Sequence, residues 1–155
     1  MMLKSNQQAI IDQYGMNPFE VLVLSPKRTL CEKIMSLVRF SQTSNPITDL
    51  GNKIRYTYDI HLMLNDGNLN FFFQSGEFDT MLLKVANDDI ISFQNNNEWL
   101  ANHPATAIIF SNTADTWSKI KTVYTGIFSE LVFGELPGQT EIQNTLLTVS
   151  DRLKQ

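Results

Sequence analysis

The chain has 155 residues, of which 43% are hydrophobic and 18% are charged, and its formal net charge is −4. This composition is that of an ordinary folded protein, and the length allows one domain with its own hydrophobic core. The negative balance and the lack of an Arg/Lys-rich helix argue against direct DNA binding. No apolar run is long enough to span a membrane and no secretory signal is recognisable, so we expect a cytoplasmic protein without membrane partners.

Residues 1–24 are expected to hold a short helix and a strand. Residues 4–14 have a weak helical pattern that ends near Gly15. In "FEVLVLS", residues 19–25, apolar side chains fall on both faces, which is typical of a strand covered on both sides. No second clear strand follows nearby, so the pattern predicts one or two short N-terminal strands whose neighbours are not evident.

A strong helix start follows this strand. Ser25 can cap a free backbone N–H, and Pro26 fits the first helical position because its missing donor costs nothing there. Apolar residues then recur at the spacing of one helix face: Leu30, Ile34, Leu37 and Val38. After the break "QTSNP", residues 48–64 are predicted to form a second helix, with Leu50, Ile54, Tyr58, His61 and Leu62 along one side.

The remainder of the chain also shows helical periodicity. Polar breaks separate five segments: "NLNFFFQ", "EFDTMLLKVANDDIISF", "WLANHPATAIIF", "TADTWSKIKTVYTGIFSELVFG" and "TEIQNTLLTVSDRL". We therefore predict a mainly α fold, with residues 1–155 as a single helical domain and residues 25–155 as a helical bundle.

Neither cysteine nor histidine indicates a metal site. Cys31 is the only cysteine, and its place within an apolar helical stripe predicts a small buried hydrophobe. His61 and His103 lie far apart, without Cys, Asp or Glu at ligand spacing. Adjacent Asp88 and Asp89 diverge on a helix and cannot easily share an ion, so a helix-end role is expected for them.

The charged residues of the first two predicted helices are the candidates for chemistry. Lys33 lies beside the apolar stripe, where a lysine commonly packs its stem and keeps its ammonium in water. Asp59 lies in "KIRYTYDIHLML", four residues after Arg55, with which it can form a surface pair. If the two helices pack antiparallel, Lys33 can instead supply the cation that a partly buried Asp59 needs.

Two segments together resemble a known family. "FEVLVLSPKRTLCEKIMSLVRF" followed by "KIRYTYDIHLML" is similar to the C-terminal half of the AbiEii/AbiGii nucleotidyltransferase toxins of bacterial toxin–antitoxin and phage-defence systems. The similarity covers about residues 18–64. It implies that Glu32 and Lys33 match a Glu-Lys motif, that Lys33 and Arg55 contact the phosphates of a nucleotide, and that Asp59 is a catalytic acidic residue.

The chain also departs from the family. The Gly-Ser turn and the D-x-D metal-binding carboxylates have no counterpart, because only 24 residues precede Ser25. Without carboxylates that hold Mg²⁺, metal-assisted phosphoryl transfer lacks its electrophile. We therefore expect no cofactor and no activity in this chain alone, whereas the complete family enzyme implies Mg²⁺ and a nucleoside triphosphate. Whether any enzyme activity remains stays open.

Two functional hypotheses follow. In the first, the chain is the helical C-terminal portion of such an enzyme, either a truncated gene product or a chain completed by a separate core. Residues 1–24 are then a remnant or edge of the core, and Lys33 and Asp59 approach one another on a concave surface. In the second, the chain is a non-catalytic helical interaction module that binds a protein such as an antitoxin. This alternative predicts an exposed apolar patch near the strand or the Trp117 helix, and Lys33 in bulk water. An uncovered edge strand also favours self-association.

Overall fold

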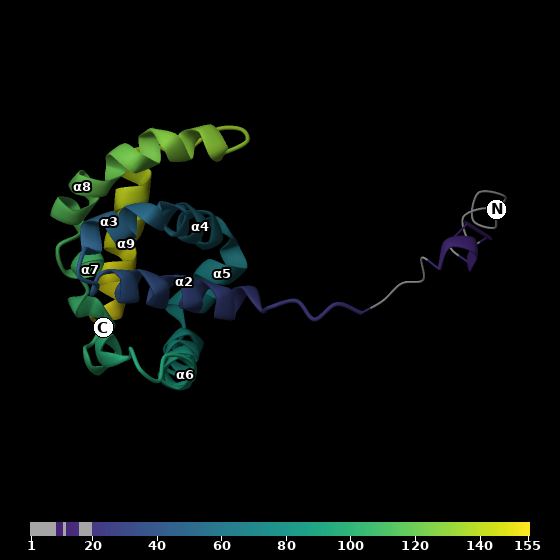
Figure 1. Ribbon diagram of the computed structural model, residues 1–155, viewed down its shortest axis with the longest axis horizontal. Helices are drawn as coiled ribbons and strands as arrows, with labels where there is room; N and C mark the ends of the chain where they lie inside the picture. The colour runs from purple at the N-terminus through teal and green to yellow at the C-terminus, as the bar shows by residue number, and fades with distance from the viewer. Residues whose placement is uncertain (1–8, 11, 16–19) are drawn as a thin grey trace.

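The computed structural model describes residues 9, 10, 12–15 and 20–155, and within these ranges the regular secondary structure is helical. The mainly α fold class is thus confirmed. The helices from Pro26 onwards gather into one body, and residues 20–25 run away from it (Figure 1). The body contains one hydrophobic core cluster that draws on most of its helices.

Helix α2, Pro26–Phe40, carries Lys33 and contacts several other helices. It packs against α6, Gly76–Ser92, and against α4, Ile54–Asn65. Its predicted apolar stripe is buried, as is Cys31, whose thiol pKa is raised to about 12 by burial. Pro26 is at the helix start as predicted, but Ser25 makes no side-chain capping hydrogen bond.

The single helix predicted over residues 48–64 was wrong in one respect, because two helices cover this range. Helix α3, Pro46–Asn52, ends at Lys53, and α4 then begins. The dipeptide Gly51-Asn52 has low helix propensity, which favours a break at this point. Of the residues predicted along one side, Leu50, Ile54 and His61 are buried, whereas Leu62 is 45% exposed.

The later segments are helical where the sequence predicts helices, but two of the five are interrupted. Pro104 interrupts the third of these segments, "WLANHPATAIIF", because a proline inside a helix removes a hydrogen bond and clashes with the preceding turn. The segment around Trp117 stops being α-helical at Gly126, where an added Cβ would lie 2.8 Å from the carbonyl oxygen of Thr122. The observed elements are α5 Gly67–Gln74, α6, η1 Glu98–Ala101, η2 Pro104–Thr106, α7 Ile108–Ser111, α8 Thr113–Thr125, η3 Ile127–Leu131 and α9 Gln139–Leu153.

Helix α9 closes the body against α4, α7 and α8. The chain reaches it through non-helical residues 132–138, which are held to α8 by the hydroxyl of Tyr124, a donor to the Pro137 carbonyl at 2.7 Å. Burial raises the pKa of the Tyr124 phenol to about 12, so the hydroxyl keeps its proton and donates over the physiological pH range. This hydrogen bond fixes the path of residues 132–138 between η3 and α9, beside a groove that is described below.

The predicted N-terminal strand was wrong for the residues that the structure describes. Residues 20–25 have no strand hydrogen bonds, and the side chains of Val21, Leu22, Val23 and Leu24 are 64%, 103%, 83% and 65% exposed. A strand needs a second strand to satisfy its backbone, and none is present in the described part of the chain. Phe19 lies outside the described residues, as do residues 1–8, 11 and 16–18. Residues 9, 10 and 12–14 are helical, and Gly15 has a φ of 63°.

Candidate functional site

Lys33 and Asp59 form an ion pair between α2 and α4. The Lys33 Nζ donates to Asp59 Oδ2 at 2.7 Å, and the two side chains are 21% and 18% exposed. Lys33 occupies the border of the buried face of α2, and Asp59 faces it from the middle of α4. The contact that the sequence predicted between these residues is therefore present, and Lys33 does not extend into bulk water.

An aromatic ring provides the second contact of the Lys33 ammonium. The Nζ atom lies 4.7 Å from the ring centroid of Tyr56, a distance at which a cation is attracted to the π face. Lys53 Nζ lies 6.0 Å from the same centroid and 5.2 Å from that of Phe40. Tyr56 therefore brings two ammonium groups together at the start of α4.

Arg55 joins this group more loosely. Its Nε is 3.7 Å from Asp59 Oδ2, and its side chain is 76% exposed. We call Lys33, Lys53 and Arg55 the basic cluster. Lys53 and Arg55 lie at the first turn of α4, where the helix dipole favours an anion rather than a cation. Lys33 and Arg55 contact the Asp59 carboxylate and Lys53 lies beside Tyr56, so the surface has a local positive charge on a chain of net charge −4.

Glu32 belongs to a different contact, although it is adjacent to Lys33 in sequence. It accepts from Arg28 Nε at 2.7 Å, and Arg28 also pairs with Asp88 of α6 at 2.8 Å. The helix-end role expected for Asp88 was therefore wrong. Asp89 is half-buried, and burial raises the pKa of its carboxyl group, while nearby Arg39 opposes the shift. Lys33 thus pairs with α4, whereas Glu32 pairs with Arg28 of its own helix, which in turn pairs with α6.

A groove lies beside the basic cluster. It has a volume of about 570 Å³ and runs between the start of α4 and the residues of and after η3. Arg55 and Tyr58 line it, and neither Lys33 nor Asp59 does. Most of its other lining side chains are apolar, so we call it the apolar groove. Of the predicted site residues, Arg55 is thus the one that faces this concave surface.

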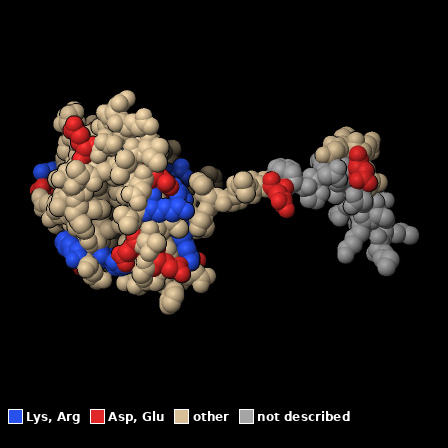
Figure 2. All heavy atoms as spheres, turned by 90° about the horizontal axis from the view of Figure 1, so that it is seen from below, with Lys and Arg blue, Asp and Glu red and all other residues tan. Residues whose placement is uncertain are grey.

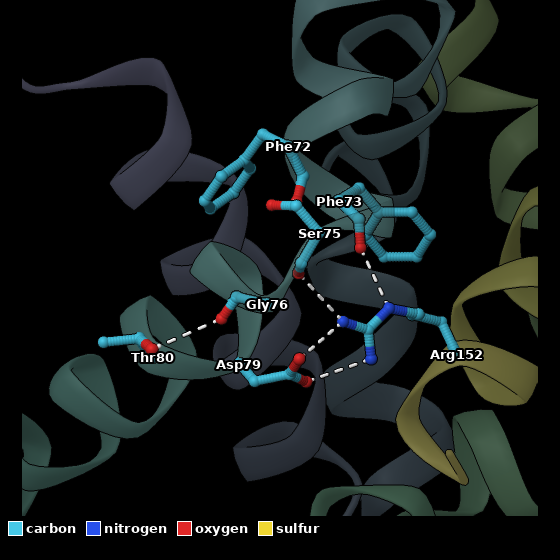
Figure 3. A network of polar contacts seen from close by, with 7 residues as sticks. All are labelled: Phe72, Phe73, Ser75, Gly76, Asp79, Thr80 and Arg152. Atoms are coloured by element: carbon cyan, nitrogen blue, oxygen red, sulfur yellow. Dashed lines mark hydrogen bonds and ion pairs between the residues drawn. The ribbon is translucent and has the colours of Figure 1, made fainter.

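A second polar network, which the sequence did not indicate, surrounds Arg152 (Figure 3). Arg152 is 8% exposed and donates to the carbonyl oxygens of Phe73 at 2.9 Å and Ser75 at 3.1 Å. It also binds both carboxylate oxygens of Asp79, at 3.0 and 2.7 Å, and thereby lowers the pKa of that carboxyl group. The guanidinium thus joins the end of α9 to the turn between α5 and α6. Arg152 and Asp79 border a cleft of about 560 Å³.

His61 is part of a structural hydrogen-bond chain between α4 and α9. The Thr145 hydroxyl donates to the Glu141 carbonyl at 3.1 Å, so it accepts from His61 Nδ1 at 2.7 Å. Nε2 then accepts from the Asn65 amide at 3.2 Å. Both ring nitrogens of this buried imidazole are hydrogen-bonded, which leaves none for a metal.

The described residues contain no group of three or more His, Cys, Asp or Glu side chains that could hold a metal ion. No helix in this part of the chain is long and apolar enough to cross a membrane. On the face shown in Figure 2, basic and acidic side chains are interspersed over the helical body. No protein-family model matches the chain, and no curated protein or solved structure is significantly similar to it.

Proposed function

We propose that this chain is the C-terminal helical portion of an AbiEii-type nucleotidyltransferase toxin, completed by a nucleotidyltransferase core on another polypeptide. The observation that carries the proposal is the contact of Lys33 with Asp59 across α2 and α4. The two sequence segments that resemble the family contribute one residue each to this contact. A cytoplasmic location follows from this function, because nucleoside triphosphates and toxin–antitoxin systems are found there.

The charge of the basic cluster suits a triphosphate. Nucleotidyl transfer releases pyrophosphate, and cations that face the phosphates stabilise the charge that develops on them. Lys33 has three N–H donors, one of which is bound by Asp59, and the guanidinium of Arg55 is largely in solvent. Asp59 orients Lys33 and balances its charge while no nucleotide is bound, and the family resemblance assigns it a catalytic role in the complete enzyme.

The described residues of this chain do not fit a Mg²⁺ site by themselves, because they lack a cluster of carboxylates. Mg²⁺ would be held by the triphosphate and the carboxylates of the core. We therefore propose that the isolated chain is inactive and that its own contribution is to bind and orient phosphate groups.

Isothermal titration tests this proposal. Each nucleoside triphosphate is titrated with Mg²⁺ into the wild-type chain, first alone and then with a core fragment that carries the Gly-Ser and D-x-D motifs. We expect binding in the presence of the core, weakened about tenfold or more by Lys33→Met, because an ion pair to phosphate is lost. Arg55→Ala should weaken it less, because Arg55 is more exposed.

Lys119→Met is the matched control for this titration. Lys119 also pairs with an aspartate, Asp115, at 2.8 Å, but both side chains are about half exposed and lie on α8. This variant should bind nucleotide like the wild type. If no triphosphate binds with the core present, or if Lys33→Met and Lys119→Met behave alike, the proposal is wrong.

A second candidate is a non-catalytic helical module that binds a protein such as an antitoxin. The favouring observation is the apolar surface after α8, where Ile127 and Leu131 are each 75% exposed and Phe133 is 104% exposed. The position of Lys33, paired rather than in bulk water, favours the first candidate. Nucleotide-independent binding of the antitoxin, with no triphosphate binding under any condition, would support the module instead.

A further inference from the structure

Residues 20–25, which we call the arm, leave the helical body from the start of α2 and run away from it (Figure 1). Four successive apolar side chains, residues 21–24, are 64% to 103% exposed. No backbone hydrogen bond joins residues 20–24 to another described residue. An extended segment with apolar side chains and unpaired backbone groups is the kind of segment that adds to another extended chain.

The apolar groove has the matching properties. Ile127, Leu131 and Phe133 border it and are largely exposed, and Phe128 and Val123 line its floor more deeply. Contiguous exposed apolar side chains of this size are typical of interaction surfaces and uncommon elsewhere on a protein surface. The groove thus offers apolar contacts to the side chains of an incoming segment.

A second non-helical segment, residues 132–136, borders the groove. Val132 has φ −97° and ψ 127°, which are strand angles, and the chain bends at Gly134, whose φ is 90°. No backbone–backbone hydrogen bond involves these residues within the described part of the chain. Their N–H and C=O groups are therefore free to pair with another extended backbone.

Charge complementarity links the arm with the groove. Glu20 is the only charged residue of the arm, and Arg55 is the only charged residue that lines the groove. The Arg55 guanidinium is 76% exposed and only loosely paired with Asp59. Figure 2 shows the arm leaving the body with no basic side chain. The apolar arm thus carries one negative charge and the apolar groove one positive charge, so the two surfaces are electrostatically complementary.

We propose that the arm of one copy of this chain binds in the apolar groove of a second copy. Its backbone pairs with Val132 and Phe133, before the bend at Gly134, the side chains of residues 21–24 cover the exposed groove residues, and Glu20 pairs with Arg55. Reciprocal exchange of two arms gives a two-fold symmetric dimer in which each contact occurs twice. The arm points away from its own body, which presents it to a second molecule. This inference goes beyond the proposed function and needs only this chain.

Sedimentation equilibrium of the full chain tests the association. At roughly 100 µM, a concentration that populates even an interface of micromolar affinity, we expect a dimer. Leu22→Asp and Phe133→Asp should each weaken dimerisation at least tenfold, as an aspartate replaces an apolar contact that occurs twice. Both side chains are fully exposed in the single chain, so neither substitution disturbs the fold. Ile91→Asp, at a 68% exposed site on α6, is the matched control and should leave the dimer intact.

Mixing the two interface variants distinguishes exchange of arms between copies from other modes of dimerisation. The arm of a Phe133→Asp copy is intact, and so is the groove of a Leu22→Asp copy. An equimolar mixture should therefore form a heterodimer through one intact contact, although each variant alone is mainly monomeric. Charge reversal gives an independent check: Glu20→Arg and Arg55→Glu should each weaken the dimer, and the double variant should restore it.

A wild-type monomer at this concentration would overturn the proposal, whether the arm stays free or folds onto its own body. A dimer that survives both Leu22→Asp and Phe133→Asp would also overturn it, because another surface would then form the interface. Nucleotide titration is a separate measurement with a supplied core. Failure of dimerisation is therefore distinguishable from failure of the proposed function.

Discussion

The two interhelical ion pairs Arg152–Asp79 and Lys33–Asp59 differ in how many N–H donors of the cation are used. Arg152 makes four hydrogen bonds, two of them to main-chain carbonyls, and is 8% exposed. Lys33 makes one hydrogen bond, to Asp59, and is 21% exposed. A pair that uses nearly all its donors holds helices together, whereas a pair with spare donors can still bind a ligand. Arg152 therefore stabilises the fold, whereas Lys33 has spare N–H donors that a ligand can bind.

The largest expected effect is that of Arg152→Ala. It leaves the Phe73 and Ser75 carbonyls without their donor and removes the link between α9 and the α5–α6 turn. We expect a loss of about 3 kcal/mol in the free energy of unfolding, measured by urea denaturation. Arg152→Lys should recover only part of it, because an ammonium cannot match the planar guanidinium. A loss of unfolding free energy below about 1 kcal/mol would mean that Arg152 does not stabilise the fold in this way.

Lys33→Met should have a smaller effect on stability. Arg55 remains near Asp59, and both members of the Lys33–Asp59 pair are partly solvated, so we expect a loss of about 1 kcal/mol in urea denaturation. Lys119→Met on α8 is the control and should change stability by less than about 0.5 kcal/mol. If Lys33→Met destabilises the protein as much as Arg152→Ala, Lys33 is structural and the comparison fails.

The pH dependence of stability gives the third and smallest effect. Arg152 lowers the pKa of Asp79 in the folded protein, so the stability this carboxylate contributes is present above its unfolded pKa of about 3.9. That contribution is lost as the pH falls through the lowered folded pKa. Because the Asp79 side chain is 59% exposed, solvent screening limits it to about 1 kcal/mol or less.

Urea denaturation of the wild type and of Asp79→Asn between about pH 6 and pH 2 measures this contribution, as the range brackets the ordinary aspartate pKa. The difference between the two proteins should shrink towards acidic pH. A difference that is constant over the whole range would mean that Asp79 contributes no charge-dependent stability, and Arg152 would then act through the carbonyl oxygens alone.

The helices themselves were largely predictable, because their signals are local. Pro26 and the apolar stripe after it define α2, and the buried positions of that stripe follow from a repeat of 3.6 residues. The break at Lys53 was not predicted, since the Gly51-Asn52 dipeptide weakens a helix without ending it in every context. Residues 20–25 show the opposite error: their apolar pattern is that of a strand, but a strand requires a partner.

The candidate site was predictable in part. Lys33 and Asp59 were paired from helix order and the cost of burying an unpaired carboxylate, and their 2.7 Å contact agrees with that argument. The contacts of Tyr56 and Lys53 with this group were not anticipated, because side-chain direction across two helices depends on how they pack. Arg152 had no sequence signal at all: its carbonyl acceptors lie more than 70 residues away in the chain.

The sequence by itself determined the helical class and the main buried faces. These depend on spacing and residue type over a few turns. Only the tertiary structure decided that Lys33 pairs with α4 whereas Glu32 pairs within α2, that Arg152 closes the body, and that an apolar arm and an apolar groove are both uncovered. Those properties depend on which residues far apart in the sequence come into contact. The free energy of packing, and not local helix propensity, decides these contacts.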